Sequence, residues 1–170
     1  SPFDYPANTL LYLVSDIPEP NQPGYDRYVA QAVIDTAATL GGRTMALFTS
    51  YSHLKTIMKM VQEPLRQEGI TVLAQLEGSS RQQLTDQFKD PNARAVLLGT
   101  RSFWEGVDVP GEALQAVMLV RIPFDVPSDP VFAARSETFD NSFFQYSIPE
   151  AILRWRQGFG RLIRRKSDEG

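Results

Sequence analysis

Short apolar runs alternate along this chain with segments whose apolar residues recur at helical spacing. The runs at residues 45–48, 70–76, 95–98 and 116–120 have the length of buried strands. The two clearest helical patterns comprise Val29, Ala30, Val33, Ile34, Ala37 and Leu40, and then Leu54, Ile57, Met58, Val61 and Leu65. Strands that alternate with helices of this length pair in parallel, because each parallel connection needs a crossover. The sequence therefore predicts an α/β fold with a doubly wound parallel sheet flanked by helices.

The chain is predicted to form one domain preceded by a connector. Residues 1–24 contain five prolines and are expected to be a connector with one short apolar strand at 10–14. Residues 25–170 are long enough to form a single domain with its own core. Within it, Ser80 and Asp129 are predicted to cap the starts of helices. The chain ends where a doubly wound domain is expected to begin another strand, so we expect the parent protein to continue.

Composition excludes several kinds of site. The 170 residues include no cysteine and a single histidine, His53. Disulfides, zinc–thiolate sites, iron–sulfur ligation within this chain and a serine triad are therefore excluded, and no metal site is predicted. His53 itself is expected to be a helix-surface or capping residue. No apolar run approaches the roughly 18 residues of a membrane span, so no membrane contact is expected.

Charge is distributed unevenly. The net charge of −3 argues against a chain that wraps nucleic acid as a polycation, yet residues 151–166 hold six basic residues and no acidic one. Phosphate contacts are therefore expected to be local.

The basic segment contains the sequence 157–164. On a helix, Gln157, Arg161 and Arg164 would lie on one face, because residues three and four apart are neighbours. Gly160 between them leaves room for a backbone or a phosphate group. Two guanidinium groups beside an amide are suited to bind a polyphosphate. The alternative is an ordinary solvated basic helix.

A second polar segment, 99–111, follows the third apolar run. Thr100 and Ser102 supply small hydroxyls at a strand end, where they are suited to a backbone phosphate. Glu105 and Asp108 follow, and Asp108 is suited to a ribose hydroxyl or to orienting an arginine. The alternative is an ordinary loop with an Asp-based turn.

The chain has no phosphate loop of its own. Gly41-Gly42-Arg43-Thr44 has an arginine where such a loop needs lysine, and it precedes a strand. Gly158-Phe159-Gly160 lacks the third glycine of a dinucleotide fingerprint. No Asp-Glu pair follows a strand to hold magnesium. If this chain contacts ATP, it must do so with arginines directed at a site on another domain.

Taken in order, these segments resemble motifs IV, V and VI of superfamily 2 helicases. The matching parts are 47–51, Gln75, 99–108 and 157–164. The Ser-Phe-x-Glu-Gly-x-Asp form and the Gly-Arg-Leu-Ile-Arg ending resemble the DinG group of the XPD-like branch, as does the opening segment 1–5. The resemblance runs the length of the chain. It implies a RecA-like second motor domain of an ATP-dependent DNA helicase, which in this family moves 5′ to 3′ on single strands.

The resemblance also implies residue roles. The residues that it places on the γ-phosphate or attacking water are Arg161, Arg164 and Gln157. Those that it places near the nucleotide, or between nucleotide and DNA, are Asp108, Gly106, Glu105 and Gly160. Those that would hold the DNA backbone are Thr49, Ser50, Thr100 and Ser102.

The implied ligands are ATP with Mg²⁺, bound mainly by a first motor domain that this chain lacks. The family's phosphate loop and iron–sulfur cysteines also belong to that domain. The implied partners are single-stranded DNA and the first motor domain of the same polypeptide, in the cytoplasm with the chromosome, in DNA repair. Two alternatives stay open: a non-catalytic nucleic-acid-binding module of the same fold, and a nuclease-associated relative.

Overall fold

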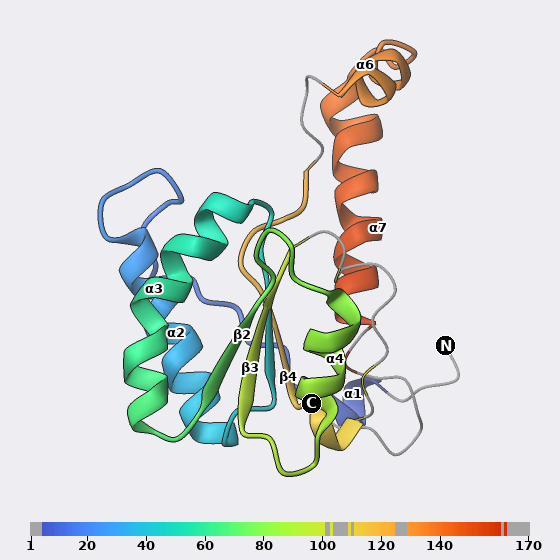
Figure 1. Cartoon of the computed structure of the whole chain (residues 1–170). Helices are drawn as coiled ribbons and strands as arrows, with labels where there is room; N and C mark the ends of the chain where they lie inside the picture. Colours follow the sequence, from blue (N-terminus) through green and yellow to red (C-terminus); the bar gives the residue numbers. More distant parts are fainter. Residues whose placement is uncertain are drawn as a thin grey trace.

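A parallel sheet forms the centre of the domain. The computed structural model describes residues 5–100, 103, 109, 111–124, 129–160 and 162. Within them the strands are β1 (Thr44–Leu47), β2 (Thr71–Ala74), β3 (Ala95–Gly99) and β4 (Ala116–Leu119). Their order across the sheet is β2-β3-β1-β4, and every pair is parallel (Figure 1). The predicted parallel α/β fold is confirmed, with each strand within a residue or two of its predicted run.

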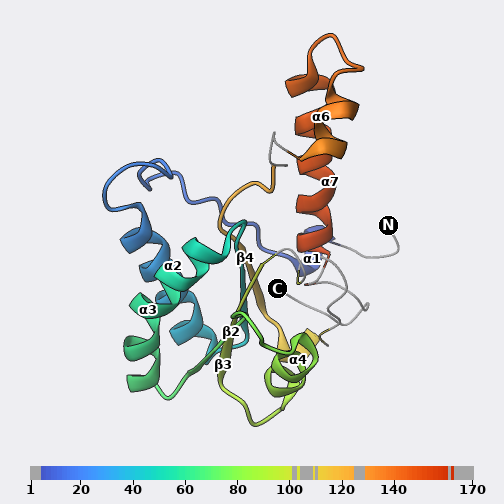
Figure 2. The ribbon, with the colours of Figure 1, turned by 45° about the horizontal axis from the view of Figure 1, so that its top comes forward.

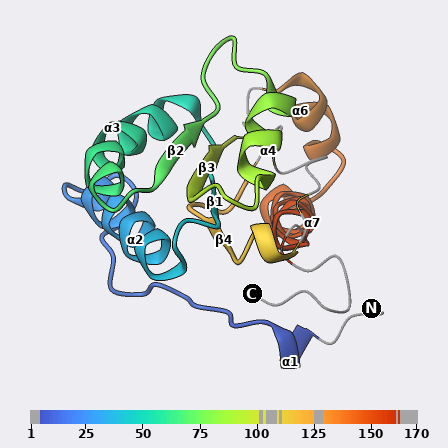
Figure 3. The same ribbon diagram turned by 60° about the horizontal axis from the view of Figure 1, so that its bottom comes forward.

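Helices cover both faces of the sheet. Helices α2 (Tyr25–Leu40) and α3 (Tyr51–Gln67) lie on one side, and α4 (Arg81–Lys89) and α7 (Ile148–Phe159) lie on the other (Figure 3). Alternate strand residues serve the two faces, because side chains along a strand point to opposite sides. Ala46, Phe48, Val96 and Leu98 belong to the core shared with α2 and α3. Met45, Leu47 and Leu97 belong to the core on the opposite face.

Both predicted helix caps are confirmed. The Ser80 hydroxyl accepts the backbone N–H of Gln83 at 3.3 Å at the start of α4. The Asp129 carboxylate accepts the backbone N–H groups of Val131 and Phe132, at 2.9 and 3.0 Å, at the start of α6 (Pro130–Ser136). These bonds satisfy donors that would have no partner inside the helix.

The strand predicted at residues 10–14 is wrong. A short helix, α1 (Tyr5–Asn8), opens the described chain, and residues 9–14 then run to α2 without regular structure. Leu10 is 81% exposed, and the next four apolar side chains are exposed as well. An apolar run becomes a strand only where a neighbouring strand pairs with its backbone, and no pairing within the described part of the chain includes these residues.

Helices α6 and the far end of α7 project beyond the sheet (Figures 1 and 2). A π-helical turn, Phe143–Ser147, joins directly to α7. The aromatic rings here contact one another: Phe139 stacks on Tyr146 with centroids 5.4 Å apart, and Phe124 stacks on Phe143 at 6.0 Å. Phe144 is 66% exposed. The aromatic residues of this projection therefore form a cluster of their own outside the sheet core.

Candidate functional site

The carboxyl ends of the strands meet at one edge of the sheet. Leu47 of β1 is level with Gly99 of β3 and Leu119 of β4. Beyond β2, the backbone N–H of Gln75 donates to the Leu98 carbonyl at 2.9 Å. The loops that follow β1, β2 and β3 consequently start side by side, and such an edge is where parallel α/β sheets bind ligands.

A buried amide connects these loops. Gln75 is 8% exposed, and its Oε1 accepts both the backbone N–H and the hydroxyl of Thr100, at 2.8 and 2.9 Å. Its Nε2 donates to the Tyr51 hydroxyl at 2.9 Å. The sequence analysis included both Gln75 and Tyr51 in the motif segments but assigned neither a role. The available signal was a lone amide at the end of an apolar strand, where packing alone would favour another apolar residue.

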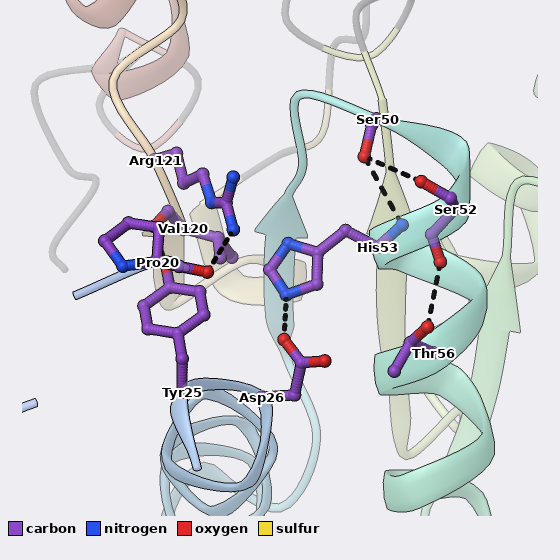
Figure 4. Close-up of polar contacts among 9 residues, drawn as sticks. All are labelled: Pro20, Tyr25, Asp26, Ser50, Ser52, His53, Thr56, Val120 and Arg121. Carbon is purple, nitrogen blue, oxygen red and sulfur yellow. Dashed lines mark hydrogen bonds and ion pairs between the residues drawn. The ribbon is translucent and has the colours of Figure 1, made fainter. Parts of the chain in front are cut away.

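The predicted DNA-binding hydroxyls differ in exposure. Thr49 and Ser50 are exposed at the start of α3, and the Ser50 hydroxyl accepts the His53 backbone N–H at 3.3 Å (Figure 4). Ser52 lies 3.3 Å from the same hydroxyl. Thr100 is at the same sheet edge but is 4% exposed, and its hydroxyl donates to Gln75. The fourth predicted residue, Ser102, lies outside the described residues.

His53 is not the surface residue that the sequence predicted. Its imidazole is 10% exposed, and its Nε2 lies 3.0 Å from Asp26 Oδ1 (Figure 4). The imidazole ring also lies 5.7 Å from the Tyr25 ring and 5.4 Å from the Phe48 ring, measured between centroids. The reason is periodicity, because residue 53 begins the four-residue series that continues through the buried Ile57, Val61 and Leu65. Burial lowers the pKa of His53 below 6.5, and Arg121 lowers it further, outweighing the rise caused by Asp26.

This pKa shift predicts a loss of stability in acid. The folded state holds His53 neutral, so below pH 6.5 the unfolded chain binds the proton first. The contribution is present above that pH and is lost as the pH falls toward the folded-state pKa. We expect the Tm of the chain to fall as the pH is lowered from 6.5, and to fall less in His53→Gln. Equal pH dependence of the two Tm values would contradict the assignment.

The segment that carries the predicted arginines follows α7. Gln157 is exposed in the last turn of that helix. Gly160 caps it, and the Gly160 N–H donates to the Arg156 carbonyl at 2.9 Å. Arg161 and Arg164 lie outside the described residues, as do Glu105, Gly106 and Asp108. Helix α7 ends at Phe159. The common helical face expected for Gln157 and the two arginines stays a prediction, because both arginines lie outside the described residues.

Two buried anchors bring the polar segments together. Phe103, within 99–111, is fully buried, and a Cβ on Gly99 would lie 2.8 Å from its side chain. Leu162, between the two arginine positions, is 5% exposed and belongs to the same core cluster as Phe103. Phe103 and Leu162, almost sixty residues apart in the sequence, are therefore buried on one face of the sheet.

Across the described residues, no three or more His, Asp or Glu side chains gather as a metal ion would require. No helix in that same part of the structure is long and apolar enough to cross a membrane.

A parallel sheet flanked by helices, with polar loops at its carboxyl edge, defines an α/β domain of the kind that binds ligands at that edge. Comparison with known proteins makes this specific: the chain belongs to the family described as "Helicase C-terminal domain", which matches residues 33–170. The predicted resemblance to the second, RecA-like motor domain of DinG-type helicases is thereby confirmed.

Several relatives match the whole chain or nearly all of it. "3'-5' exonuclease DinG" of Bacillus subtilis is 38% identical over 178 residues, which cover 100% of this chain and 19% of the relative. "ATP-dependent DNA helicase YoaA" of Escherichia coli is 36% identical over 174 residues, covering 100% of this chain and 27% of the relative. "3'-5' exonuclease DinG" of Staphylococcus aureus is 31% identical, covering 96% of this chain and 18% of the relative. The chain therefore spans between a fifth and a quarter, approximately, of the proteins it matches.

Proposed function

We propose that this chain is the second motor domain of an ATP-dependent DNA helicase. In this proposal Arg161 and Arg164 act on an ATP whose Mg²⁺ and phosphates are bound mainly by the first motor domain of the same polypeptide. Family membership supports the proposal, and relatives 36% and 35% identical are named ATP-dependent DNA helicases. Movement in the 5′ to 3′ direction is proposed from the family resemblance.

The observation that carries the proposal is the shared burial of Phe103 and Leu162. Each is the anchor of a polar segment: 99–111, with Glu105, Gly106 and Asp108, and 157–164, with Gln157, Gly160 and the two arginines. Packing in one cluster places both anchors on the same face of the sheet. If both segments contact the same nucleotide, the residues proposed for its ribose and those proposed for its γ-phosphate must lie on the same side of the domain.

Arginines supplied by a second domain suit phosphoryl transfer. The reaction depends mainly on positioning and on stabilising charge around the transferred phosphoryl group, and an arginine finger typically adds about 10³–10⁵ in rate. A finger on a separate domain also couples hydrolysis to motion, because the γ-phosphate holds the two domains together only until it is cleaved. Gln157, exposed in the last turn of α7, is proposed to orient the same phosphate or the attacking water.

The DNA grip is proposed at the strand ends. Thr49 and Ser50 present exposed hydroxyls at the start of α3, and contacts of this kind hold a phosphate backbone without reading its sequence. Ser102 and Thr100 complete the proposed set. Because the Thr100 hydroxyl donates to Gln75, Thr100 is proposed to act through that amide.

ATP turnover tests the proposal. We expect the full-length parent to hydrolyse ATP faster when single-stranded DNA is added, because both motor domains are then aligned on the strand. The purified 170-residue chain should show no turnover above background with or without DNA, since it has no phosphate loop. Appreciable turnover by the isolated chain would contradict the two-domain site, and a parent without DNA-stimulated turnover would contradict the motor.

A second candidate comes from the names of two relatives, which are described as 3'-5' exonucleases. The parent of this chain would then degrade single strands, with this domain binding the strand. Incubating the parent with 5′-labelled single-stranded DNA and Mg²⁺, without ATP, distinguishes the two. Shortening of the labelled strand would support exonuclease activity. An intact strand would contradict it and would be consistent with the helicase proposal.

A further inference from the structure

The Gln75 amide has one orientation that its surroundings permit. The backbone N–H of Thr100 can only donate, so it determines that Oε1 is the atom on that side, 2.8 Å away. The Nε2 atom is consequently directed at Tyr51, whose hydroxyl accepts at 2.9 Å. A buried amide that is hydrogen-bonded at both ends is held in place, because losing a hydrogen bond is costly for a buried polar group.

The hydrogen bonds of Gln75 to Tyr51 and Thr100 form a bridge between two segments. One is the start of α3, in the proposed DNA grip; in the other, Thr100, also proposed for DNA, precedes residues proposed for the nucleotide. Tyr51 is the first residue of α3 and directly follows Ser50, whose exposed hydroxyl lies on the proposed DNA side. Thr100 opens the segment that leads to Glu105, Gly106 and Asp108, which lie on the proposed nucleotide side. A displacement of the Thr100 backbone would shift the Gln75 amide, and the hydrogen bond from Gln75 to Tyr51 would transmit the shift to the start of α3.

Further hydrogen bonds connect the other residues at the start of α3. The Ser50 hydroxyl accepts the His53 N–H, and the Thr56 hydroxyl donates to the Ser52 carbonyl at 3.1 Å, so the first turns are internally bonded. His53 in turn is held against Asp26 of α2 at 3.0 Å. Tyr51 is half exposed and is the residue of the first turn that the bridge connects to β2 and β3.

We infer that Gln75 is a positioning residue that couples the nucleotide state of the segment beginning at Thr100 to the DNA grip at the start of α3. This inference rests on the proposed motor function. In thermodynamic terms, bound nucleotide changes the affinity for single-stranded DNA by a coupling factor. We expect the size of that factor to depend on Gln75. In this inference Gln75 acts through its hydrogen bonds to Thr100 and Tyr51.

The test compares single-stranded DNA affinity in two nucleotide states. The full-length parent is titrated into a fluorescent single-stranded oligonucleotide, without nucleotide and with a non-hydrolysable ATP analogue plus Mg²⁺. The coupling is measured as the larger of the two Kd values divided by the smaller. For the wild type we expect a ratio of about five or more, the lower end of usual coupling factors. In Gln75→Met, which keeps the side-chain length and removes both polar ends, the ratio should approach one.

Two further variants complete the design. Tyr51→Phe removes one end of the bridge, keeps the aromatic ring, and changes a half-exposed residue, so it is expected to fold and to lower the ratio toward one. Gln82→Met is the matched control, because exposed Gln82 makes only a surface bond to Asp86 at 2.8 Å; its ratio should equal that of the wild type.

The outcomes separate this inference from the proposed function. A lower ratio in Gln75→Met and Tyr51→Phe supports the coupling. Equal weakening in both nucleotide states, which a merely structural role would produce, overturns it, and so does a variant ratio equal to that of the wild type. A wild type that binds DNA and hydrolyses ATP with a ratio of one overturns the coupling alone. A wild type with no DNA-stimulated hydrolysis refutes the motor proposal instead.

Discussion

Arg164→Ala in the full-length parent is expected to reduce DNA-stimulated ATP turnover by about 10³ or more. The guanidinium is proposed to stabilise charge that develops on the γ-phosphate oxygens, and alanine offers neither the charge nor the paired donors. Affinity for single-stranded DNA should change little, because the proposed grip lies at Thr49, Ser50 and their neighbours. Steady-state hydrolysis and DNA titration on the same preparation measure both quantities.

A charge-matched control makes this result interpretable. Arg156→Ala removes one positive charge from the same basic segment, at an exposed position in α7, and should leave turnover close to that of the wild type. The non-catalytic binding module predicts the opposite pattern for Arg164→Ala. In that case DNA affinity falls and the slope of its salt dependence shrinks by about one phosphate contact, while turnover does not depend on the variant.

Gly42→Ala is expected to destabilise the fold by about 4 kcal/mol or more, an exceptional loss for one methyl group. Gly42 has φ +97°, where a side chain is strained, and its N–H donates to the Ala37 carbonyl at 2.8 Å to end α2. A Cβ there would lie 2.5 Å from the backbone N of Ala95 and 2.9 Å from its carbonyl O. To relieve this collision, Ala95 would have to move, and Ala95 is the first residue of β3, a buried strand in the interior of the sheet.

Gly78→Ala separates strain from collision. Gly78 has φ +83°, close to the Gly42 value, but a Cβ there meets no atom within 4 Å. It should therefore cost only the conformational penalty of about 1–2 kcal/mol. Urea unfolding of the two variants, followed by circular dichroism, gives the comparison. Similar losses in both would mean that the approach of Gly42 to Ala95 contributes nothing.

Local sequence signals predicted much of the architecture correctly. The strands appear within a residue or two of their apolar runs, Ser80 and Asp129 cap their helices, and the Gly41-Gly42 pair ends α2. Each of these features depends on residues close together in the sequence. A strand follows from the length of an apolar run, a helix cap from a side-chain oxygen two or three residues before an N–H, and a helix end from a glycine that tolerates positive φ.

The errors arose where the outcome depends on distant residues. Residues 10–14 have the composition of a strand, but in the described structure they have no pairing partner. His53 looked like a surface residue because histidine usually tolerates water. The spacing to Ile57 places it instead on the buried face of α3, where Asp26 from another helix pairs with it.

By itself, the sequence determined the fold class, the order of its strands along the chain and the family, because apolar periodicity and motif order are local properties of a chain. Only the tertiary structure decided which polar groups meet. Gln75, Tyr51 and Thr100 are up to 49 residues apart in sequence, as their numbers show, yet they form one hydrogen-bonded network. Parallel pairing brings the ends of β2 and β3 to the same edge, and a buried amide there must satisfy its hydrogen bonds with whatever donors and acceptors that edge supplies.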